Sequence, residues 1–152
     1  MKNVCFRRWF LFLAVLLVGG CVLAASQNLP EFGVKLFVND VPLVPVWDTE
    51  QTATVTLHPG DVLRIEIESN ATTGYEWELV SEVDERFLKL ESNDYFPPNS
   101  QLMGAGGWQH LVFSAMDPGV TSVQLEYRRP WDPADTVEGW NLFVHVYVQP
   151  VE

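Results

Sequence analysis

The stretch Asp61-Val-Leu-Arg-Ile-Glu-Ile-Glu-Ser-Asn-Ala-Thr-Thr-Gly-Tyr-Glu-Trp77 carries the pattern around which the rest of the chain can be organised. Its first eight residues alternate apolar and charged side chains, which is the period of a half-buried β-strand. Tyr75 and Trp77 resume an alternation, so the segment before them is a tip that joins two strands. Gly74 can adopt backbone angles that a side chain would forbid, and Asn70 can hydrogen-bond its own backbone and stiffen the turn. The tip is narrow and uncharged, which suits insertion into a cleft better than acid–base chemistry.

The N-terminus of the chain has the features of an export signal. A basic start precedes an unbroken apolar run from Trp9 to Val18. A run of about ten residues is too short to span a bilayer as a stable helix and fits the core of a signal peptide. We therefore expect residues 1–20 to direct export in a bacterium, to the cell envelope, the periplasm or the medium.

The end of this leader resembles the lipobox of bacterial lipoproteins, in which cleavage precedes a cysteine that is then lipidated. The box reads Val18-Gly-Gly-Cys21, with valine where leucine is usual. We expect lipidation at Cys21, as the protein's means of attachment to a membrane, and ordinary cleavage near Ala24 is the alternative. Residues 21–31 then form a tether, and residues 32–152 form the folded domain.

Charge and cysteine content narrow the classes of function. Residues 1–20 hold three basic residues and no acidic one, so their removal moves the formal charge from −11 to −14. Nucleic-acid binding requires a basic face, so this acidic balance argues against it. Cys5 lies in the leader and Cys21 is the lipidation candidate, which leaves no cysteine for a disulfide or a nucleophile. The remaining 132 residues are enough for one domain that is held by packing alone.

Short stretches with a two-residue alternation or with many β-branched residues recur along the chain, and turn-forming sequences separate them. They cover residues 32–38, 52–57, 62–68, 75–80, 109–115, 121–127 and 142–148, with weaker candidates at 44–47 and 88–90. We interpret Asp94 to Ser100 and Asp132 to Asp135 as loops. After the leader, no stretch has a convincing helical period. Seven to eight short strands in one domain predict an all-β antiparallel sandwich.

Three loops between these strands have unusual compositions. The first loop is Asn70-Ala-Thr-Thr-Gly-Tyr75, the second loop is Gly104-Ala-Gly-Gly107, which Trp108 follows, and the third loop is Arg129-Pro-Trp131. Each of these sequences is common when it occurs alone, and Thr72-Thr-Gly74 by itself could be a plain hairpin turn.

In this order and at these separations, the three loops resemble the chagasin-like inhibitors of papain-family cysteine peptidases. That family reads Asn-Pro-Thr-Thr-Gly-Tyr, Gly-x-Gly-Gly and Arg-Pro-Trp, and Phe113-Ser-Ala115 with Asp117-Pro-Gly119 matches it in style. The resemblance runs roughly from residue 50 to residue 150. It implies an immunoglobulin-like sandwich with the three loops at one end. The first loop would enter the catalytic cleft, the other two would embrace the peptidase from the sides, and inhibition would be reversible.

The resemblance implies a set of peptidase-binding residues: Asn70, Ala71, Thr72, Thr73, Gly74, Tyr75, Gly104, Gly106, Gly107, Trp108, Arg129, Pro130 and Trp131. Threonine hydroxyls and backbone groups can bond to a cleft without the cost of burying a charge. An aromatic side chain on a stiff turn is a typical interface anchor, worth about 2 kcal/mol or more when central. We therefore expect Trp131 to be exposed and Trp77 to lie in the core. Arg129 would either brace its loop or pair with an acidic group of the peptidase.

One residue departs from the family pattern. Ala71 stands where the family has proline, so the chain is freer at that position. The missing proline could weaken preorganisation of the tip by about 0.4–1 kcal/mol, unless Asn70 holds the same shape.

Other classes of function have less support in the sequence. No set of residues supplies a nucleophile, a base and an orienting group, so we do not expect an enzyme. We expect no cofactor and no metal, because the histidines follow no ligand spacing. Asp132, Asp135 and Glu138 could offer oxygens to calcium, but a solvated acidic loop is the simpler interpretation. The alternative function is a cell-envelope binding module that uses the same loops for another protein or glycan. In either role we expect a monomer.

Overall fold

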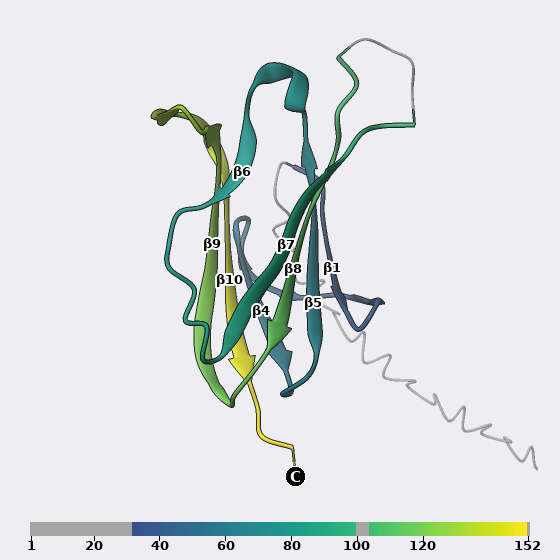
Figure 1. The fold of residues 1–152 in the computed structure, drawn as a ribbon, viewed down its shortest axis with the longest axis vertical. Helices are drawn as coiled ribbons and strands as arrows, with labels where there is room; N and C mark the ends of the chain where they lie inside the picture. The colour runs from purple at the N-terminus through teal and green to yellow at the C-terminus, as the bar shows by residue number, and fades with distance from the viewer. Residues whose placement is uncertain (1–31, 100–103, 152) are drawn as a thin grey trace, which may run out of the picture.

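The computed structural model describes residues 32–99 and 104–151. The predicted signal peptide (1–20), the lipidation candidate Cys21 and the tether (21–31) lie outside the described residues. The described part folds into two five-stranded sheets that face each other across one core (Figure 1). The predicted all-β, immunoglobulin-like sandwich is thereby confirmed. Among the described residues, no helix is long and apolar enough to cross a membrane.

The chain passes repeatedly from one sheet to the other. The β5 sheet contains, in spatial order, β2 (Val41–Leu43), β1 (Val34–Val38), β5 (Val62–Ser69), β8 (Gly107–Ala115) and β7 (Leu88–Phe96). The β10 sheet contains β3 (Val46–Thr49), β4 (Thr52–Leu57), β10 (Asp132–Val148), β9 (Gly119–Arg129) and β6 (Glu76–Leu79). A 3-10 turn, η1 (Ala71–Thr73), carries the chain from β5 in one sheet to β6 in the other.

The core forms because the strands alternate inward and outward side chains. In β5 and β8, every second residue is buried, and the residues between them face solvent. The largest fully buried side chains come from both sheets: Trp77, Phe113, Leu57, Leu63, Ile65, Ile67, Leu88, Leu111, Leu125 and Leu142. The predicted core position of Trp77 is therefore confirmed.

The sequence patterns missed parts of three strands and one pairing. The described residues form ten strands instead of seven or eight, since the weaker candidates at 44–47 and 88–90 pair as β3 and β7 and the short edge strand β2 adds another. The segment 94–96, interpreted as part of a loop, extends β7. The segment 132–135, interpreted as an acidic loop, begins β10 and pairs with the end of β9 across two register shifts. The sandwich is also not wholly antiparallel, because β4 and β10 run parallel, with Val55 beside Val146.

Three connections gather at one end of the sandwich, at the top of Figure 1. There η1 follows β5, the hairpin of β7 and β8 turns back, and Pro130-Trp131 joins β9 to β10. The tip formed by η1 stands between the other two connections (Figure 1). These connections are the three loops that the sequence singles out.

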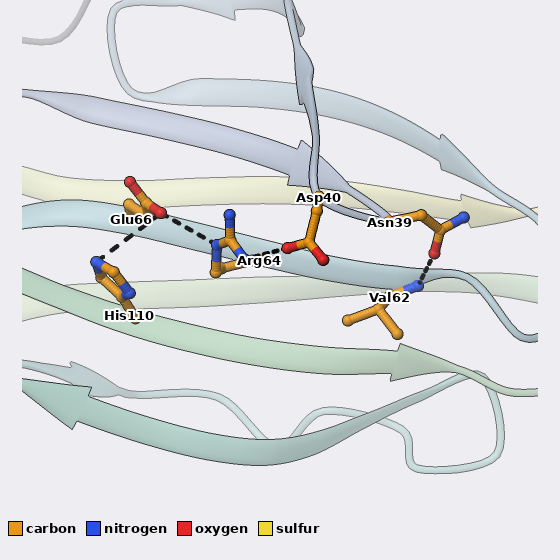
Figure 2. A network of polar contacts seen from close by, with 6 residues as sticks. All are labelled: Asn39, Asp40, Val62, Arg64, Glu66 and His110. Atoms are coloured by element: carbon orange, nitrogen blue, oxygen red, sulfur yellow. Dashed lines mark hydrogen bonds and ion pairs between the residues drawn. The ribbon is translucent and has the colours of Figure 1, made fainter.

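The opposite end of the β5 sheet is held by a polar network on its outer face (Figure 2). The Asn39 side chain accepts a hydrogen bond from the Val62 backbone N–H at 2.9 Å, and the Arg64 guanidinium pairs with Asp40 and with Glu66. Glu66 also lies 3.9 Å from the His110 Nε2 atom. These contacts attach the turn after β1 to β5, at the end of β5 that is remote from the three loops.

Candidate functional site

Asn70 organises the first loop. Its side-chain oxygen accepts hydrogen bonds from the backbone N–H of Thr72 at 3.2 Å and from the Thr72 hydroxyl at 2.7 Å. Its backbone carbonyl accepts from the Thr73 N–H at 3.0 Å and from the Thr73 hydroxyl at 2.7 Å. This is the N-cap arrangement that satisfies the free donors at the start of a helical turn. The loop therefore keeps a defined shape although Ala71 replaces the family's proline.

The sequence predicts that the hydroxyls of Thr72 and Thr73 bond to the cleft of the peptidase, but the structure shows them bonded within the loop. Both donate their protons inside the loop, and the Thr73 oxygen also accepts from the Tyr75 N–H at 3.3 Å. Each hydroxyl has one proton, so toward a partner these side chains offer acceptor lone pairs and methyl groups. Residues 71–73 are exposed and carry no charge, although the Thr72 and Thr73 N–H groups and the Ala71 carbonyl are hydrogen-bonded within the loop.

Gly74 closes the first loop and contacts the third. Its φ of +79° lies in the left-handed region, where glycine has no steric cost. A Cβ atom at this position would lie 2.7 Å from the Trp131 Cη2 atom, so the indole rests directly on the glycine. Even so, Trp131 is 71% exposed, which confirms the predicted exposure of this aromatic side chain.

Aromatic rings form the base beneath the first loop. The Tyr127 hydroxyl accepts a hydrogen bond from the Asn70 N–H at 2.8 Å, and the Trp77 indole N–H donates to the Glu68 carbonyl at 2.8 Å. The rings of Trp77 and Tyr127 lie 5.2 Å apart, and Trp140 packs 5.0 Å from Tyr127. Packed aromatic pairs of this kind contribute about 0.5–1.5 kcal/mol beyond their buried area. The two hydrogen bonds attach Asn70 and the end of β5 to this aromatic base.

The second loop is tied to the first by one side chain. The Asn70 side-chain amide donates a hydrogen bond to the Gly104 carbonyl at 3.1 Å. Gly104 and Gly106 are exposed, but Gly107 is buried, and a Cβ atom there would lie 2.2 Å from the Phe96 carbonyl oxygen. Gly107 therefore serves the pairing of β7 with β8 and presents no side chain to a partner. Trp108 is half-buried, with the Lys35 ammonium 4.0 Å from its ring centre.

The third loop is a two-residue turn at the tip of a β-ribbon. Arg129 and Asp132 pair across it, and Pro130 and Trp131 form the turn itself. The Arg129 guanidinium lies 4.6 Å from the centre of the Tyr75 ring and donates to the Asp135 carboxylate at 2.6 Å. Of the two roles predicted for Arg129, the structure shows the internal brace.

Asp135 is a site residue that sequence reasoning did not select. Its second carboxylate oxygen accepts from the Tyr75 hydroxyl at 2.6 Å, so it joins the end of the first loop to the third. This hydrogen bond is the main reason that the pKa of Tyr75 lies above its usual value, with desolvation the next largest cause. The sequence held only a weak indication of this role, namely an acidic residue that follows an arginine by a few positions.

An open pocket of about 600 Å³ lies between the first and second loops. Asn70, Thr73 and Tyr75 form one wall, and Gly106 and Trp108 form another. In the described part of the chain, no group of three or more His, Cys, Asp or Glu side chains is placed to hold a metal ion. The three-loop end thus offers an uncharged tip, an aromatic flank and a hollow between them.

Comparison with known proteins identifies the family. The family model of chagasin family peptidase inhibitor I42 matches residues 56–146. Chagasin of Trypanosoma cruzi is 38% identical over 96 residues, which cover 60% of this chain and 87% of that protein. Amoebiasin-2 of Entamoeba histolytica is 26% identical over 85 residues, which cover 56% of this chain and 69% of that protein.

Solved structures show the same fold. A crystal structure of a cysteine protease inhibitor from Entamoeba histolytica superposes with a TM-score of 0.54 at 22% identity, covering 65% of this chain and 87% of that one. The solution structure of amebosin gives a TM-score of 0.52 at 28% identity, covering 67% and 90%.

The chain belongs to the chagasin family of peptidase inhibitors. The resemblance carried by the three loops is thereby confirmed. The protein is an inhibitor and not an enzyme.

Proposed function

We propose that the chain inhibits papain-like cysteine peptidases by laying its three-loop end over the catalytic cleft. The observation that carries this proposal is the direct contact among the three loops: Asn70 bonds to Gly104, and the Trp131 ring covers Gly74. The uncharged tip of the first loop thereby stands between the other two loops at one end of the sandwich (Figure 1). The chain's membership of the chagasin family of peptidase inhibitors supports the inhibitory role.

Inhibition on this basis is occlusion, without covalent chemistry. The exposed, uncharged tip of residues 71–73 enters the cleft, where the acceptor groups that it presents form hydrogen bonds without burial of an unpaired charge. Trp131 and Trp108 contact the rims of the cleft as aromatic anchors. Gly104 and Gly106 keep the second loop small enough to approach the enzyme.

The test is titration of papain with the purified chain, expressed from residue 1 and isolated in the form that the cell produces. We expect complete, reversible loss of activity toward a peptide substrate, and no inhibition at micromolar concentration would refute the proposal. Trp131→Ala should raise the inhibition constant about thirtyfold, since a central aromatic anchor contributes about 2 kcal/mol. Tyr147→Ala is the matched control, because this tyrosine is 42% exposed on β10 near the opposite end of the sandwich.

We further propose that the chain is an exported bacterial protein of the cell envelope, lipidated at Cys21 after removal of residues 1–20. The basic start, the apolar run and the lipobox-like Val18-Gly-Gly-Cys21 support this. One chain supplies all three loops, so a monomer suffices for inhibition. Mass spectrometry of the mature N-terminus distinguishes a lipidated Cys21 from cleavage near Ala24.

A further inference from the structure

Asp135 occupies a junction between two of the three loops. It lies on β10, four residues after Trp131, and each of its carboxylate oxygens accepts a 2.6 Å hydrogen bond. One bond comes from the Tyr75 hydroxyl at the end of the first loop, and the other comes from the Arg129 guanidinium in the third. Because Arg129 also stacks on the Tyr75 ring, the three side chains form a closed triangle.

We propose that Asp135 is a positioning residue that holds Trp131 against Gly74 and so presents the first and third loops to the peptidase as one preformed surface. This inference rests on the proposed function for its effect on inhibition. Asp135 itself is not needed for contact with the enzyme. It acts through Arg129 and Tyr75, whose positions determine where the turn that carries Trp131 lies.

The triangle is partly shielded from water. The side chains of Arg129 and Asp135 are 37% and 33% exposed, so both are partly shielded from water. Hydrogen bonds to an ionised carboxylate are roughly twice as strong as those between neutral groups. In the described structure, the Nε atom of Arg129 is buried and has no hydrogen-bond partner. Without the Asp135 carboxylate, the guanidinium would lose the acceptor that holds it there.

Loss of this junction should appear as a loss of preorganisation. The ribbon formed by the ends of β9 and β10 projects from the sandwich, and its register shifts twice between Asp132 and Asn141 (Figure 1). Such a ribbon has few ladder contacts of its own that could fix its tip. When only a fraction of molecules has the binding-competent arrangement, the apparent affinity falls by that fraction.

The test compares Asp135→Asn and Asp135→Ala with the wild-type chain in papain inhibition. Asp135→Asn keeps an acceptor for Tyr75 and loses the charge, whereas Asp135→Ala loses both bonds. We expect the inhibition constant to rise about threefold and at least tenfold, respectively, as the competent fraction falls. Asp40→Asn is the control, because it removes another aspartate–arginine pair at the far end of the β5 sheet (Figure 2). Wild-type inhibition by Asp135→Ala would overturn the proposal.

A double-mutant cycle separates positioning from a general loss of stability. Tyr75→Phe removes the hydroxyl and keeps the ring beneath Arg129. If Asp135 acts through Tyr75, the effects of Tyr75→Phe and Asp135→Ala on the inhibition constant are not additive, and the double variant is little worse than Asp135→Ala alone. Fully additive effects would contradict the proposal. The unfolding midpoint should stay near the wild-type value throughout.

A measurement on the protein without peptidase tests the positioning role of Asp135 separately from the proposed inhibition. In the wild-type chain, NMR should show a strong nuclear Overhauser effect between the Trp131 ring and the Gly74 α protons. Asp135→Ala should weaken it markedly, and Asp40→Asn should leave it intact. An unchanged signal in Asp135→Ala would overturn the positioning role, even if the wild-type chain inhibits papain. If the wild-type chain fails to inhibit papain, the proposed function fails, and the NMR signal still decides the role of Asp135.

Discussion

The position of Gly74 requires both a left-handed backbone and the absence of a side chain. Its backbone is left-handed, with φ at +79°, and its α carbon lies under the Trp131 ring. In Gly74→Ala, the methyl group adds left-handed strain of about 1–2 kcal/mol and also displaces the indole. We expect a lower free energy of unfolding together with an inhibition constant raised at least tenfold. Thermal unfolding and papain titration measure the two effects.

Gly60 offers a matched control for that prediction. Its φ is +91°, and a Cβ atom there would meet nothing within 4 Å. Gly60→Ala should therefore lose similar stability and keep full inhibition. Equal inhibition by the two variants would show that the contact between Gly74 and Trp131 has no part in binding.

Ala71 poses the opposite question, whether the family's proline would improve this tip. Ala71 is the first residue of η1, where a missing N–H and a fixed φ suit proline. The preceding residue, Asn70, has φ −130° and ψ +89°, outside the α region that proline disfavours before it. Ala71→Pro should stabilise the protein by about 0.4–1 kcal/mol and tighten inhibition slightly. A lower unfolding midpoint would mean that Asn70 shapes the tip in a way that proline cannot share.

Single residues differ in how far their roles could be predicted from the sequence. Asn70 and Gly74 could be assigned because the tendencies involved, side-chain capping and left-handed φ, are local. The exposure of Trp131 followed from its place after proline and outside a strand alternation. Asp135 could not be selected, since Arg129 meets it through the pairing of β9 with β10, and Tyr75 meets it only because β6 also pairs with β9. A non-local contact of this kind leaves no local pattern.

Among the secondary-structure elements, β6, the strand that follows the first loop, is held in place by one buried side chain. Gln109 projects from β8 and bridges the two sheets: its oxygen accepts from the Trp77 N–H at 2.9 Å, and its nitrogen donates to the Trp77 carbonyl at 2.7 Å and to the Asn93 side chain at 2.8 Å. Because Trp77 lies on the edge strand β6, these bonds replace the ladder partner that the strand lacks on that side.

Gln109→Met keeps the volume of the side chain and removes these bonds. Two buried backbone groups of Trp77 are then unsatisfied, which should lower the free energy of unfolding by about 2–4 kcal/mol. Gln124→Met, on the partly exposed face of β9, is the control and should change stability by less than about 0.5 kcal/mol. Denaturant unfolding measures both variants. A small loss in Gln109→Met would show that β6 is held by its pairing with β9 alone.

Elements with strong alternation could be predicted, and those fixed by a partner strand could not. The segment 62–68 and the segment 142–148 have clear two-residue patterns and were placed correctly. Residues 94–96 (Asp-Tyr-Phe) precede two prolines, and residues 132–140 lack a clear alternation. The first segment nevertheless pairs as the end of the first arm of the β7–β8 hairpin, and the second pairs in the second arm of the β9–β10 hairpin. The parallel pairing of β4 with β10 joins segments about ninety residues apart, so turn sequences between neighbouring strands hold no information about it.

At the scale of the whole molecule, the chain enters the domain at the end that carries the three loops. Gly33 exchanges hydrogen bonds with Glu68, two residues before Asn70, and Phe32 packs 4.8 Å from the Trp77 ring. The C-terminus leaves from the opposite end, where the Gln149 N–H donates to the Leu57 carbonyl (Figure 1). A tether that precedes Phe32 would therefore start beside the surface that we propose for peptidase binding.

This placement predicts that lipid attachment at Cys21 limits access to large partners. Residues 22–31 number ten, and even fully extended they reach at most about 35 Å. A peptidase domain of about 200 residues has a radius of gyration of about 16 Å and is roughly 40 Å across. On a vesicle surface, the three-loop end would lie too close to the bilayer for unhindered approach of such an enzyme.

We expect the vesicle-bound chain to associate with papain several-fold more slowly than the soluble Cys21→Ser variant, because the bilayer blocks part of the approach. A flexible insertion of about 20 Gly and Ser residues after Ser26 should restore the association rate on vesicles, since it raises the average reach of a flexible tether from about 17 Å to about 30 Å. The same insertion in the Cys21→Ser variant is the control and should change nothing. Stopped-flow measurement of papain inhibition gives these rates. Equal rates for the vesicle-bound and soluble forms without the insertion would show that the tether leads away from the binding end.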